Sequence, residues 1–236
     1  MTVLELAIER LAGAPERLRL ASPRLVVAGY TGRDVATVEH HVAELASLGV
    51  PPPPEVPAYW ILPNWLLAVA HDGVEIGVAT SSGEAEPVII RTASGKLYVT
   101  VGSDHTDREL ERTSIVLAKT VCPKLVAESA WPFEEVAEGW DALGLRSYVG
   151  DEESPYQSGT LASLRPPLEL LGRAEELAAA DGQALVLFLG TVPLLEGGFR
   201  YEPRFTAALD DPEHGRELRF SYRLDWVAPA AASMET

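Results

Sequence analysis

Two glutamates separated by one residue, Glu84 and Glu86, are the first residues in this sequence whose types and spacing indicate chemistry. Side chains of an extended segment alternate between its two faces, so residues at this spacing point the same way and place their carboxylates side by side. Like charges that lie this close are unfavourable unless a cation sits between them. The flanking residues are rich in Val and Ile, which favours a buried strand and raises the cost of an unpaired carboxylate.

A third acid, Asp104, lies downstream in the segment Gly-Ser-Asp-His-Thr-Asp-Arg at residues 102–108. Together with Glu84 and Glu86 it supplies three oxygen ligands, the donor set that suits a hard divalent ion such as Mg²⁺ or Mn²⁺. The alternative is an E-x-E pair on the solvent face of an edge strand, which needs no ion. The spacing predicts a metal site and leaves this alternative open.

Short strands are the elements that must position these carboxylates. Residues 64–126 and 185–224 consist of short β segments broken by Gly, Asp and Ser, and residues 25–29 form a further apolar strand. This pattern is typical of a predominantly β domain.

Two helices are expected beside the strands. Asp34 suits an N-cap, because valines follow it at helical spacing, and the proline-rich run at residues 51–54 ends that helix. Such a run is stiff and extended, which predicts a small lid-like unit rather than a free linker. A second helix is expected over about residues 167–180, ending at Gly182.

Composition and charge narrow the class of protein. The 236 residues are enough for one large domain with a substantial core, and the formal net charge of -16 argues against nucleic acid or an anionic membrane as a partner. Cys122 is the single cysteine, which excludes an intramolecular disulfide. No stretch approaches the about 20 apolar residues of a membrane span, and the N-terminus lacks a secretory signal, so a soluble cytoplasmic protein is expected.

Short motifs that follow one another along the chain resemble the pattern of the fumarylacetoacetate hydrolase family. That pattern runs from H-x-x-E through a proline-marked loop, E-x-E, a segment like N-D-V-T-x-R-D, a lysine-containing segment and Q-x-G-x-T to G-T-P. The matching segments here are residues 41–44, 51–54 with Pro57, 84–86, 103–108, 119–123, 157–160 and 190–193. Each motif alone is weak, but their shared order indicates the family.

The resemblance implies an α+β fold that is mostly β: a mixed β-roll of the family's catalytic-domain type with a small N-terminal lid-like helix. It divides the chain into an N-terminal segment, residues 1–63, which carries the helix and packs on the main body, and a β-roll catalytic domain, residues 64–228. Residues 229–236 are mostly small and are expected to form a disordered tail.

Departures from the family pattern indicate a divergent bacterial branch. Asp104 follows Glu86 more closely than is usual, and Val192 splits the usual G-T-P. Pro87 follows the E-x-E where an apolar residue that can donate to the ladder is typical, which suggests a strand edge or a bulge. These departures concern the identity of the substrate more than metal binding.

The resemblance also implies roles for the acids and for a lysine. Glu84, Glu86 and Asp104 are implied to hold Mg²⁺ or Mn²⁺, which chelates the carboxylate and the 2-oxo oxygen of a 2-oxo acid. Lys119 is implied to stabilise the negative charge that develops in the reaction. Its alternative is an exposed lysine without a catalytic role.

The resemblance implies further roles for residues of the N-terminal helix and of two later motifs. His41 is implied to be the base that takes a proton from water, oriented by Glu44 three residues later on the same side of the helix. The alternative is a solvated surface pair, and His40 is a rival base. Gln157 and Thr191 are implied to bind the substrate, although Thr191 also suits a turn after a strand.

The residues beside Asp104 are expected to have supporting roles rather than to bind the metal. Strand alternation points His105 away from the metal, which favours a packing or supporting role over ligation. Asp107 and Arg108 are expected to form a structural ion pair or to contact the ligand segment.

The implied activity is a metal-dependent hydrolase that cleaves a C–C bond in an acylpyruvate-like 2-oxo acid through a metal-bound enolate. Decarboxylation, dehydration and isomerisation of 2-oxo acids on the same fold are alternatives, and so is a noncatalytic metal-binding homologue. The expected partners are a small-molecule 2-oxo acid and a second copy of the chain in a homodimer.

Overall fold

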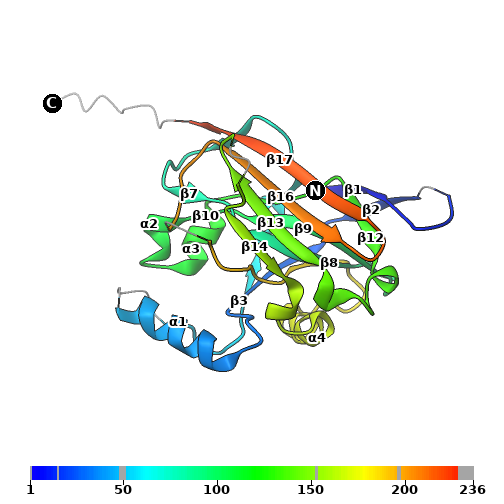
Figure 1. The fold of residues 1–236 in the computed structure, drawn as a ribbon, viewed down its shortest axis with the longest axis horizontal. Helices are drawn as coiled ribbons and strands as arrows, with labels where there is room; N and C mark the ends of the chain where they lie inside the picture. Colours follow the sequence, from blue (N-terminus) through cyan, green and yellow to red (C-terminus); the bar gives the residue numbers. More distant parts are fainter. Residues whose placement is uncertain (1, 15, 48–51, 152–153, 196–197, 228–236) are drawn as a thin grey trace.

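The computed structural model describes residues 2–14, 16–47, 52–151, 154–195 and 198–227, without the side chains of residues 41, 44, 45 and 47. The molecule is mostly β, with a curled mixed sheet that forms a half-barrel and a few helices at its periphery (Figure 1). The predicted fold class is confirmed. The predicted tail, residues 229–236, lies outside the described residues.

The largest sheet in the described part of the chain has ten strands. Eight of them follow one another from edge to edge as β2 (Glu16–Ala21), β1 (Val3–Ile8), β12 (Ser129–Pro132), β9 (Leu97–Asp104), β8 (Ala85–Arg91), β15 (Leu185–Phe188), β3 (Arg24–Gly29) and β4 (Ala58–Leu62). The other two are β11 (Lys124–Val126), which pairs with β9, and β5 (Leu67–Val69), which pairs with β11.

The central strands β8 and β9 are buried on both faces, which explains their nearly continuous apolar sequence. Ile89 and Val99 contribute to one hydrophobic cluster, and Val88 and Ile90 contribute to a second on the opposite face. A segment that is covered on both sides holds its ends in fixed positions, and the proposed metal ligands lie at those ends.

A second sheet covers the first hydrophobic cluster. It has five strands in the order β14 (Gln157–Thr160), β13 (Gly144–Val149), β16 (Arg204–Asp211), β17 (Arg216–Trp226) and β6 (Val74–Ile76). In β17 exposed and buried residues alternate, as expected of a strand with one face on the core and one face in solvent. A small ribbon pairs β7 (Ser81–Ser82) with β10 (Thr106–Asp107).

Four α-helices and four short 3₁₀ turns complete the described residues. The helices are α1 (Val35–Ser47), α2 (Arg108–Glu111), α3 (Ile115–Thr120) and α4 (Pro167–Ala178); the 3₁₀ turns are Asn64–Leu66, Phe133–Glu135, Trp140–Ala142 and Leu161–Ser163. Asp34 caps α1 as predicted, since its Oδ1 accepts from the amide of Ala36 at 3.0 Å. The second helix is confirmed, but it ends before Gly182, because Ala179 already adopts a left-handed conformation with φ 45°.

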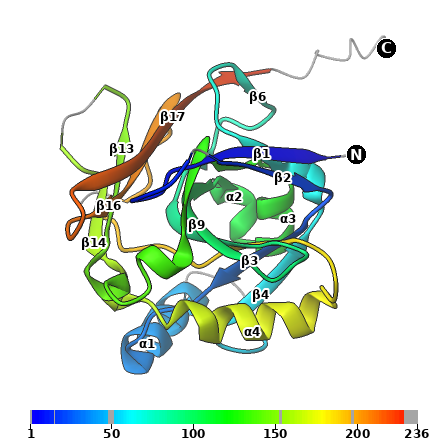
Figure 2. The ribbon, with the colours of Figure 1, turned by 90° about the vertical axis from the view of Figure 1, so that its right-hand side faces the viewer.

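The N-terminal segment contributes four strands, β1 to β4, to the large sheet. Helix α1 lies at the periphery of the molecule in both views (Figures 1 and 2). The division at residue 63 and the lid role of α1 stay predictions. No helix in the described residues has the length and apolar character that a membrane crossing requires.

The expectation that Pro87 marks a strand edge or a bulge is wrong. β8 pairs with β9 on one side and with β15 on the other, so Pro87 lies in an interior strand. Its carbonyl accepts from the amide of Leu189 at 3.1 Å, but proline has no N–H to return the bond. The Thr31 hydroxyl donates to the carbonyl of Leu189 at 2.7 Å instead, which restores the bond that the proline removes.

Candidate metal centre

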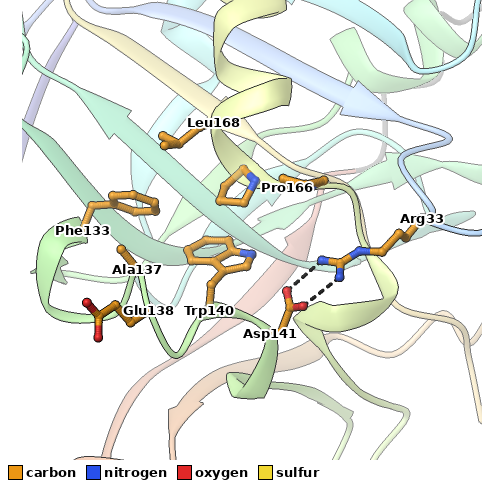
Figure 3. Close-up of a pocket in the computed structure, with 9 residues that line it drawn as sticks. Arg33, Phe133, Ala137, Glu138, Trp140, Asp141, Pro166 and Leu168 are labelled. Atoms are coloured by element: carbon orange, nitrogen blue, oxygen red, sulfur yellow. Dashed lines mark hydrogen bonds and ion pairs between the residues drawn. The ribbon is translucent and has the colours of Figure 1, made fainter.

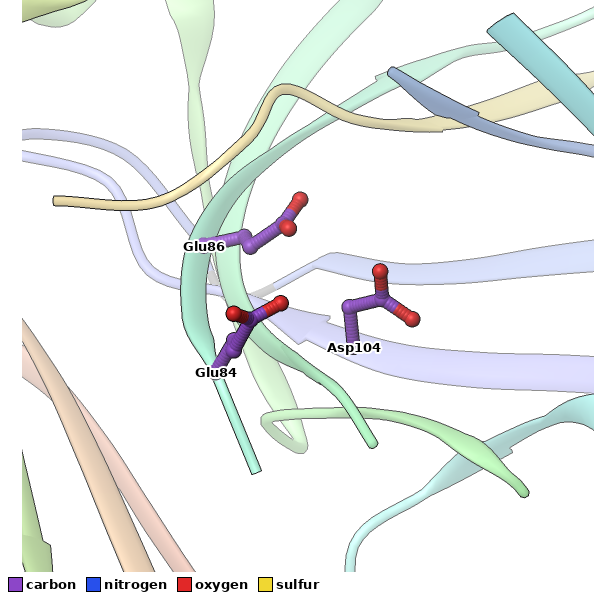
Figure 4. Close-up of side chains that lie close together, drawn as sticks. All are labelled: Glu84, Glu86 and Asp104. Atoms are coloured by element: carbon purple, nitrogen blue, oxygen red, sulfur yellow. The ribbon is translucent and has the colours of Figure 1, made fainter. Parts of the chain in front are cut away.

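The register of β8 and β9 brings the three predicted acids together. Ala85 pairs with Ser103, Glu86 pairs with Gly102, and the amide of Asp104 donates to the carbonyl of Glu84 at 3.0 Å. The start of one strand therefore lies beside the end of the other. One carboxylate oxygen from each acid lies within 4.8 Å of the others, and the three side chains converge (Figure 4).

Two of the three carboxylates are removed from water, which makes their charge unfavourable without a counterion. Glu86 is 2% exposed and Asp104 is fully buried. Burial, together with the nearby charge of Asp104, raises the pKa of Glu86 well above its ordinary value. Burial also raises the pKa of Glu84, although Arg108 opposes that shift. Without a cation between them, Glu84 and Glu86 resist ionisation.

Two lysines pair with Asp104. Lys119 Nζ contacts Asp104 Oδ2, and Lys124 Nζ lies 3.0 Å from Oδ1. Burial disfavours the charged form of Asp104, but the two ammonium groups outweigh it and hold the pKa below its ordinary value. Lys119 is therefore buried and paired, not an exposed lysine.

Lys124 was missed by the sequence reasoning. It is fully buried, and its ammonium also donates to the carbonyls of His105 and Cys122 at 2.6 and 3.2 Å. Burial lowers its pKa while Asp104 opposes the shift. The signal in the sequence was a lysine at the start of an apolar strand, but the pairing of β11 with β9 that sets it opposite Asp104 is not visible in the sequence.

Glu84 is held from the side of the helices. Arg108 Nη2 lies 3.2 Å from Glu84 Oε1, and Arg108 Nη1 lies 2.9 Å from Glu111 Oε2. The Phe199 ring covers this guanidinium, with its centroid 4.1 Å from Cζ. Arg108 thus contacts the ligand segment, one of the two roles expected for it. Asp107 instead caps α2 by accepting from the amide of Glu109 at 3.0 Å.

Glu86 is held from the loop after β15. Gly190 has φ 91°, a conformation that favours glycine, and its amide donates to Glu86 Oε2 at 2.8 Å. A Cβ at this position would lie 2.1 Å from the Thr31 hydroxyl oxygen. The glycine of the G-T-P-like motif is therefore required both by its backbone conformation and by the close approach of Thr31.

The donor set fits a hard divalent cation. All three groups are carboxylates, their oxygens converge within 4.8 Å, and two of them have a raised pKa that a cation would reverse. The ammonium groups on Asp104 are compatible with an ion, because a carboxylate offers about four lone-pair sites. Metal ligation by these residues stays a proposal.

Gln157 and Thr191 form a clamp around the start of β8. Gln157 Oε1 accepts from the amide of Ala85 at 3.1 Å and from the Ser147 hydroxyl at 2.8 Å, while Nε2 donates to the Thr191 hydroxyl at 2.7 Å. Thr191 in turn donates to the carbonyl of Ala85 at 2.6 Å. Both residues line the large cavity described next, and their substrate roles stay predictions.

A cavity of about 890 Å³ opens onto the cluster. Glu84, Glu86 and Lys119 line it, together with residues of α1 that include His40. The side chains of the predicted base His41 and of Glu44 lie outside those described, so the choice between His40 and His41 stays open. The cavity is large enough for a small-molecule ligand.

His105 supports the cluster from behind. It is 1% exposed, and its Nδ1 lies 2.8 Å from the Tyr222 hydroxyl, which also lies 2.9 Å from the Ser103 hydroxyl. Burial, reinforced by Lys124 and Arg108, lowers the pKa of His105 to about 3 and keeps its ring neutral. This agrees with a packing role rather than ligation.

A second cavity of about 420 Å³ lies near the start of α4 (Figure 3). Its lining is mostly apolar, with Phe133, Trp140 and Leu168 among the residues that form it. Arg33 lines both cavities and makes a bidentate pair with Asp141, with both N to O distances 2.7 Å. The carboxylate cluster belongs to the larger cavity alone.

Comparison with known proteins supports the fold and gives a family. The family model described as a protein of unknown function, DUF2848, matches residues 28–222. A search of curated proteins gave no match.

Solved structures of similar fold include proteins assigned as hydrolases and a dehydratase. A protein assigned as a fumarylpyruvate hydrolase from Burkholderia cenocepacia is 17% identical, with TM-score 0.61 over 94% of this chain and 95% of that chain. One assigned as a fumarylacetoacetate isomerase/hydrolase from Oleispira antarctica is 19% identical, with TM-score 0.56 over 94% and 99%. A 2-keto-3-deoxy-D-arabinonate dehydratase complexed with magnesium and 2,5-dioxopentanoate is 12% identical, with TM-score 0.58 over 87% and 74%. The chain therefore has the fumarylacetoacetate hydrolase fold.

Proposed function

This chain belongs to the DUF2848 family and has the fold of the fumarylacetoacetate hydrolase family, and from this premise we propose a divalent-metal-dependent hydrolase. Its substrate would be an acylpyruvate-like 2-oxo acid, cleaved at a C–C bond. Because one fold serves many activities, the proposal rests on the site rather than on the fold.

One observation carries the proposal: three carboxylates converge, two of them buried, and Glu84, Glu86 and Lys119 line one cavity beside them. Glu84, Glu86 and Asp104 would hold Mg²⁺ or Mn²⁺, and the bound ion would supply Lewis-acid stabilisation of negative charge on substrate oxygens. The magnesium complex of the dehydratase of similar fold supports this choice of ion. Lys119 would hold a further positive charge beside the site, since its carboxylate neighbours outweigh burial and raise its pKa.

The proposed hydrolysis cleaves the bond between the distal carbonyl carbon and C3 of the 2-oxo acid. Water adds to the distal carbonyl carbon, and the bond from that carbon to C3 breaks. The acyl fragment leaves as a carboxylic acid, and the pyruvyl fragment takes up a proton at C3. In this scheme His41 takes the proton from water while Glu44 orients its ring, and Gln157 and Thr191 hold the carboxylate end of the substrate.

Two alternative functions are compatible with the same residues. Decarboxylation, dehydration or isomerisation of a 2-oxo acid would need the same ion and the same lysine. The dehydratase and isomerase names among proteins of similar fold support the last two. A noncatalytic metal-binding homologue is the second alternative. It leaves unexplained why Lys119 lies against the carboxylates and lines the cavity.

The partner expected for the site is a small-molecule 2-oxo acid, as in the dehydratase complex with 2,5-dioxopentanoate. The proposed assembly is a homodimer, which light scattering of the purified protein would test. A monomer at all concentrations would remove the dimer from the account without affecting the metal site.

A panel of acylpyruvates tests the activity. Turnover is expected to need Mg²⁺ or Mn²⁺ and to produce pyruvate and a carboxylic acid in equal amounts. Release of carbon dioxide, or loss of water without C–C cleavage, would favour the alternatives. Metal binding measured in parallel keeps the outcome informative, because binding without turnover on the whole panel would support the noncatalytic homologue.

A further inference from the structure

An aromatic shelf lies beside the carboxylate cluster. Trp60 lines the cavity, its ring centroid lies 5.3 Å from Lys119 Nζ, and its ring lies 6.4 Å from that of Tyr30. Both aromatic residues thus lie close to the end of the cavity that would hold the 2-oxo acid head group.

The backbone around this shelf is specialised. A Cβ on Gly29 would lie 2.6 Å from the Trp60 ring, so the ring packs directly on the glycine backbone. Tyr30 follows with φ 56°, a left-handed conformation that is unfavourable for a bulky residue. Strain of this kind persists only where surrounding contacts impose it, and it is concentrated at ligand-binding sites. The pairing of β3 with β4 sets Val27 opposite Trp60 and thereby fixes the position of the indole.

Apolar side chains extend this surface around the cavity. They come from separate parts of the chain: Val38 on α1, Ile115 on α3, and Leu164, Leu194 and Phe199 on loops. A ligand that reaches beyond the carboxylate cluster therefore meets aromatic and aliphatic surface.

The basic groups of the cavity are already paired. Among the lining residues that the structure describes, the basic side chains other than histidine are Arg33 and Lys119. Arg33 is held in the bidentate pair with Asp141 (Figure 3), and its Nε donates to the carbonyl of Leu164 at 2.9 Å. Lys119 is paired with Asp104.

Acids outside the cluster add to this effect. Asp34 and Glu111 also line the cavity. Asp34 caps α1 and Glu111 pairs with Arg108, so neither acid offers a partner to a carboxylate at the far end of a substrate. An anionic group that is desolvated without a partner is strongly disfavoured. The charge pattern thus favours substrates whose only anionic group is the head.

We infer that this site takes 2-oxo acids whose distal group is neutral and apolar or aromatic, and that Trp60 determines this specificity by packing against that group. The inference rests on the proposed function, since it assumes that the 2-oxo acid head binds at the carboxylate cluster. It goes further by excluding substrates with a second carboxylate at the distal end.

The test compares two ligands that share a head and differ at the tail. Calorimetry of the full-length Mg²⁺-loaded protein would measure the affinities for 5-methyl-2-oxohexanoate, which ends in an isopropyl group, and for 2-oxoglutarate, which ends in a carboxylate of similar shape. The first is expected to bind at least about tenfold more tightly, the equivalent of about 1.4 kcal/mol. Oxalate, which has a chelating head and no tail, serves as the reference.

The variant Trp60→Ala is expected to remove most of the preference, because the ratio of the two affinities cancels any common effect on the head. Trp65→Ala is the matched control, since Trp65 is 67% exposed and does not line the cavity. The wild-type ratio needs no variant and holds even if Trp60→Ala fails to fold.

Three outcomes would count against the inference. Equal or tighter binding of 2-oxoglutarate, with oxalate bound, would overturn the specificity and leave the proposed function standing. A preference that survives Trp60→Ala in a folded protein would overturn the role of Trp60. Failure of oxalate to bind at all would overturn the proposed function and the inference together.

Discussion

At the scale of single residues, the centre is a largely buried arrangement of opposite charges. Glu84, Glu86 and Asp104 face Arg108, Lys119 and Lys124, and each cation contacts a different part of the cluster. Glu86 has no direct ion pair in the described structure and holds only the Gly190 amide bond. It is therefore the carboxylate that has most to gain from a bound cation.

Glu86→Gln separates metal binding from stability. The amide oxygen can still accept from Gly190, so the fold is retained, and removal of a buried carboxylate with a raised pKa should leave the melting temperature of the metal-free protein unchanged or higher. The affinity for Mn²⁺ should fall about tenfold to a hundredfold. Glu75→Gln, on the exposed face of β6, is the control. Unchanged Mn²⁺ affinity in Glu86→Gln would exclude Glu86 as a ligand.

The two lysines should differ in what they support. Lys124 is fully buried and bonded to two carbonyls, so Lys124→Met should destabilise the protein by about 3 kcal/mol in urea unfolding. Lys119 lines the cavity, so Lys119→Met should lower oxalate affinity of the Mg²⁺-loaded protein about tenfold. Each variant controls for the other. Equal losses of stability and of oxalate affinity in both would contradict this division.

At the scale of elements, strand register does most of the positioning. β8 and β9 place Glu84 beside Asp104, and β11 places Lys124 opposite Asp104 from the other side of β9. The loop after β15 contacts Glu86 through the amide of Gly190. Four segments far apart in the chain thus meet at one end of the large sheet.

Thr31 should act as the substitute for the missing amide of Pro87. Thr31→Val keeps the shape and removes the hydroxyl, which leaves the carbonyl of Leu189 unsatisfied and should cost about 1–3 kcal/mol of unfolding free energy. Thr113→Val, at an exposed position, should change stability by less than about 0.5 kcal/mol. If the two substitutions cost the same in urea unfolding, the Thr31 bond contributes nothing.

The turn between β16 and β17 carries a pH-dependent contribution to stability. Asp211 is buried and accepts from Arg216 Nε and His214 Nδ1, both at 2.9 Å. Burial opposes its charge, but these bonds prevail and lower its pKa. A carboxyl whose pKa is lower in the folded state stabilises the protein above its unfolded pKa of about 3.9, and this stabilisation is lost as the pH falls through the folded pKa.

Asp211→Asn should therefore destabilise the protein by about 2 kcal/mol near neutral pH, and the difference from wild type should shrink below about pH 4. Urea unfolding at pH 7, 5 and 3 measures this, with Asp225→Asn on the exposed face of β17 as control. A difference that stays constant over this range would mean that the Asp211 charge does not stabilise the fold.

The sequence was informative where chemistry follows from residue type and short spacing. The E-x-E pair, Asp104 and Lys119 could be grouped because their order matched a known pattern, and the Asp34 cap follows from local helix chemistry. Lys124 and Thr31 could not be found in this way. Their roles depend on strand pairing and on a loop contact between residues far apart in sequence.

At the scale of the whole molecule, charge is divided unevenly. The chain carries a formal net charge of -16, yet three of its cations are buried around one carboxylate cluster. A cluster with this composition can hold a divalent ion and still attract a single anionic head group, while acids around the cavity oppose a second anionic group. This combination links the proposed metal site to the proposed class of substrate.

The most direct test is calorimetric titration of the metal-stripped, full-length protein with Mg²⁺ and Mn²⁺, first alone and then with oxalate. The account predicts saturable binding at one site per chain that oxalate strengthens, together with a melting temperature that rises with metal concentration as mass action requires. No binding of either ion to a folded protein would contradict the central claim, and the three carboxylates would then be structural.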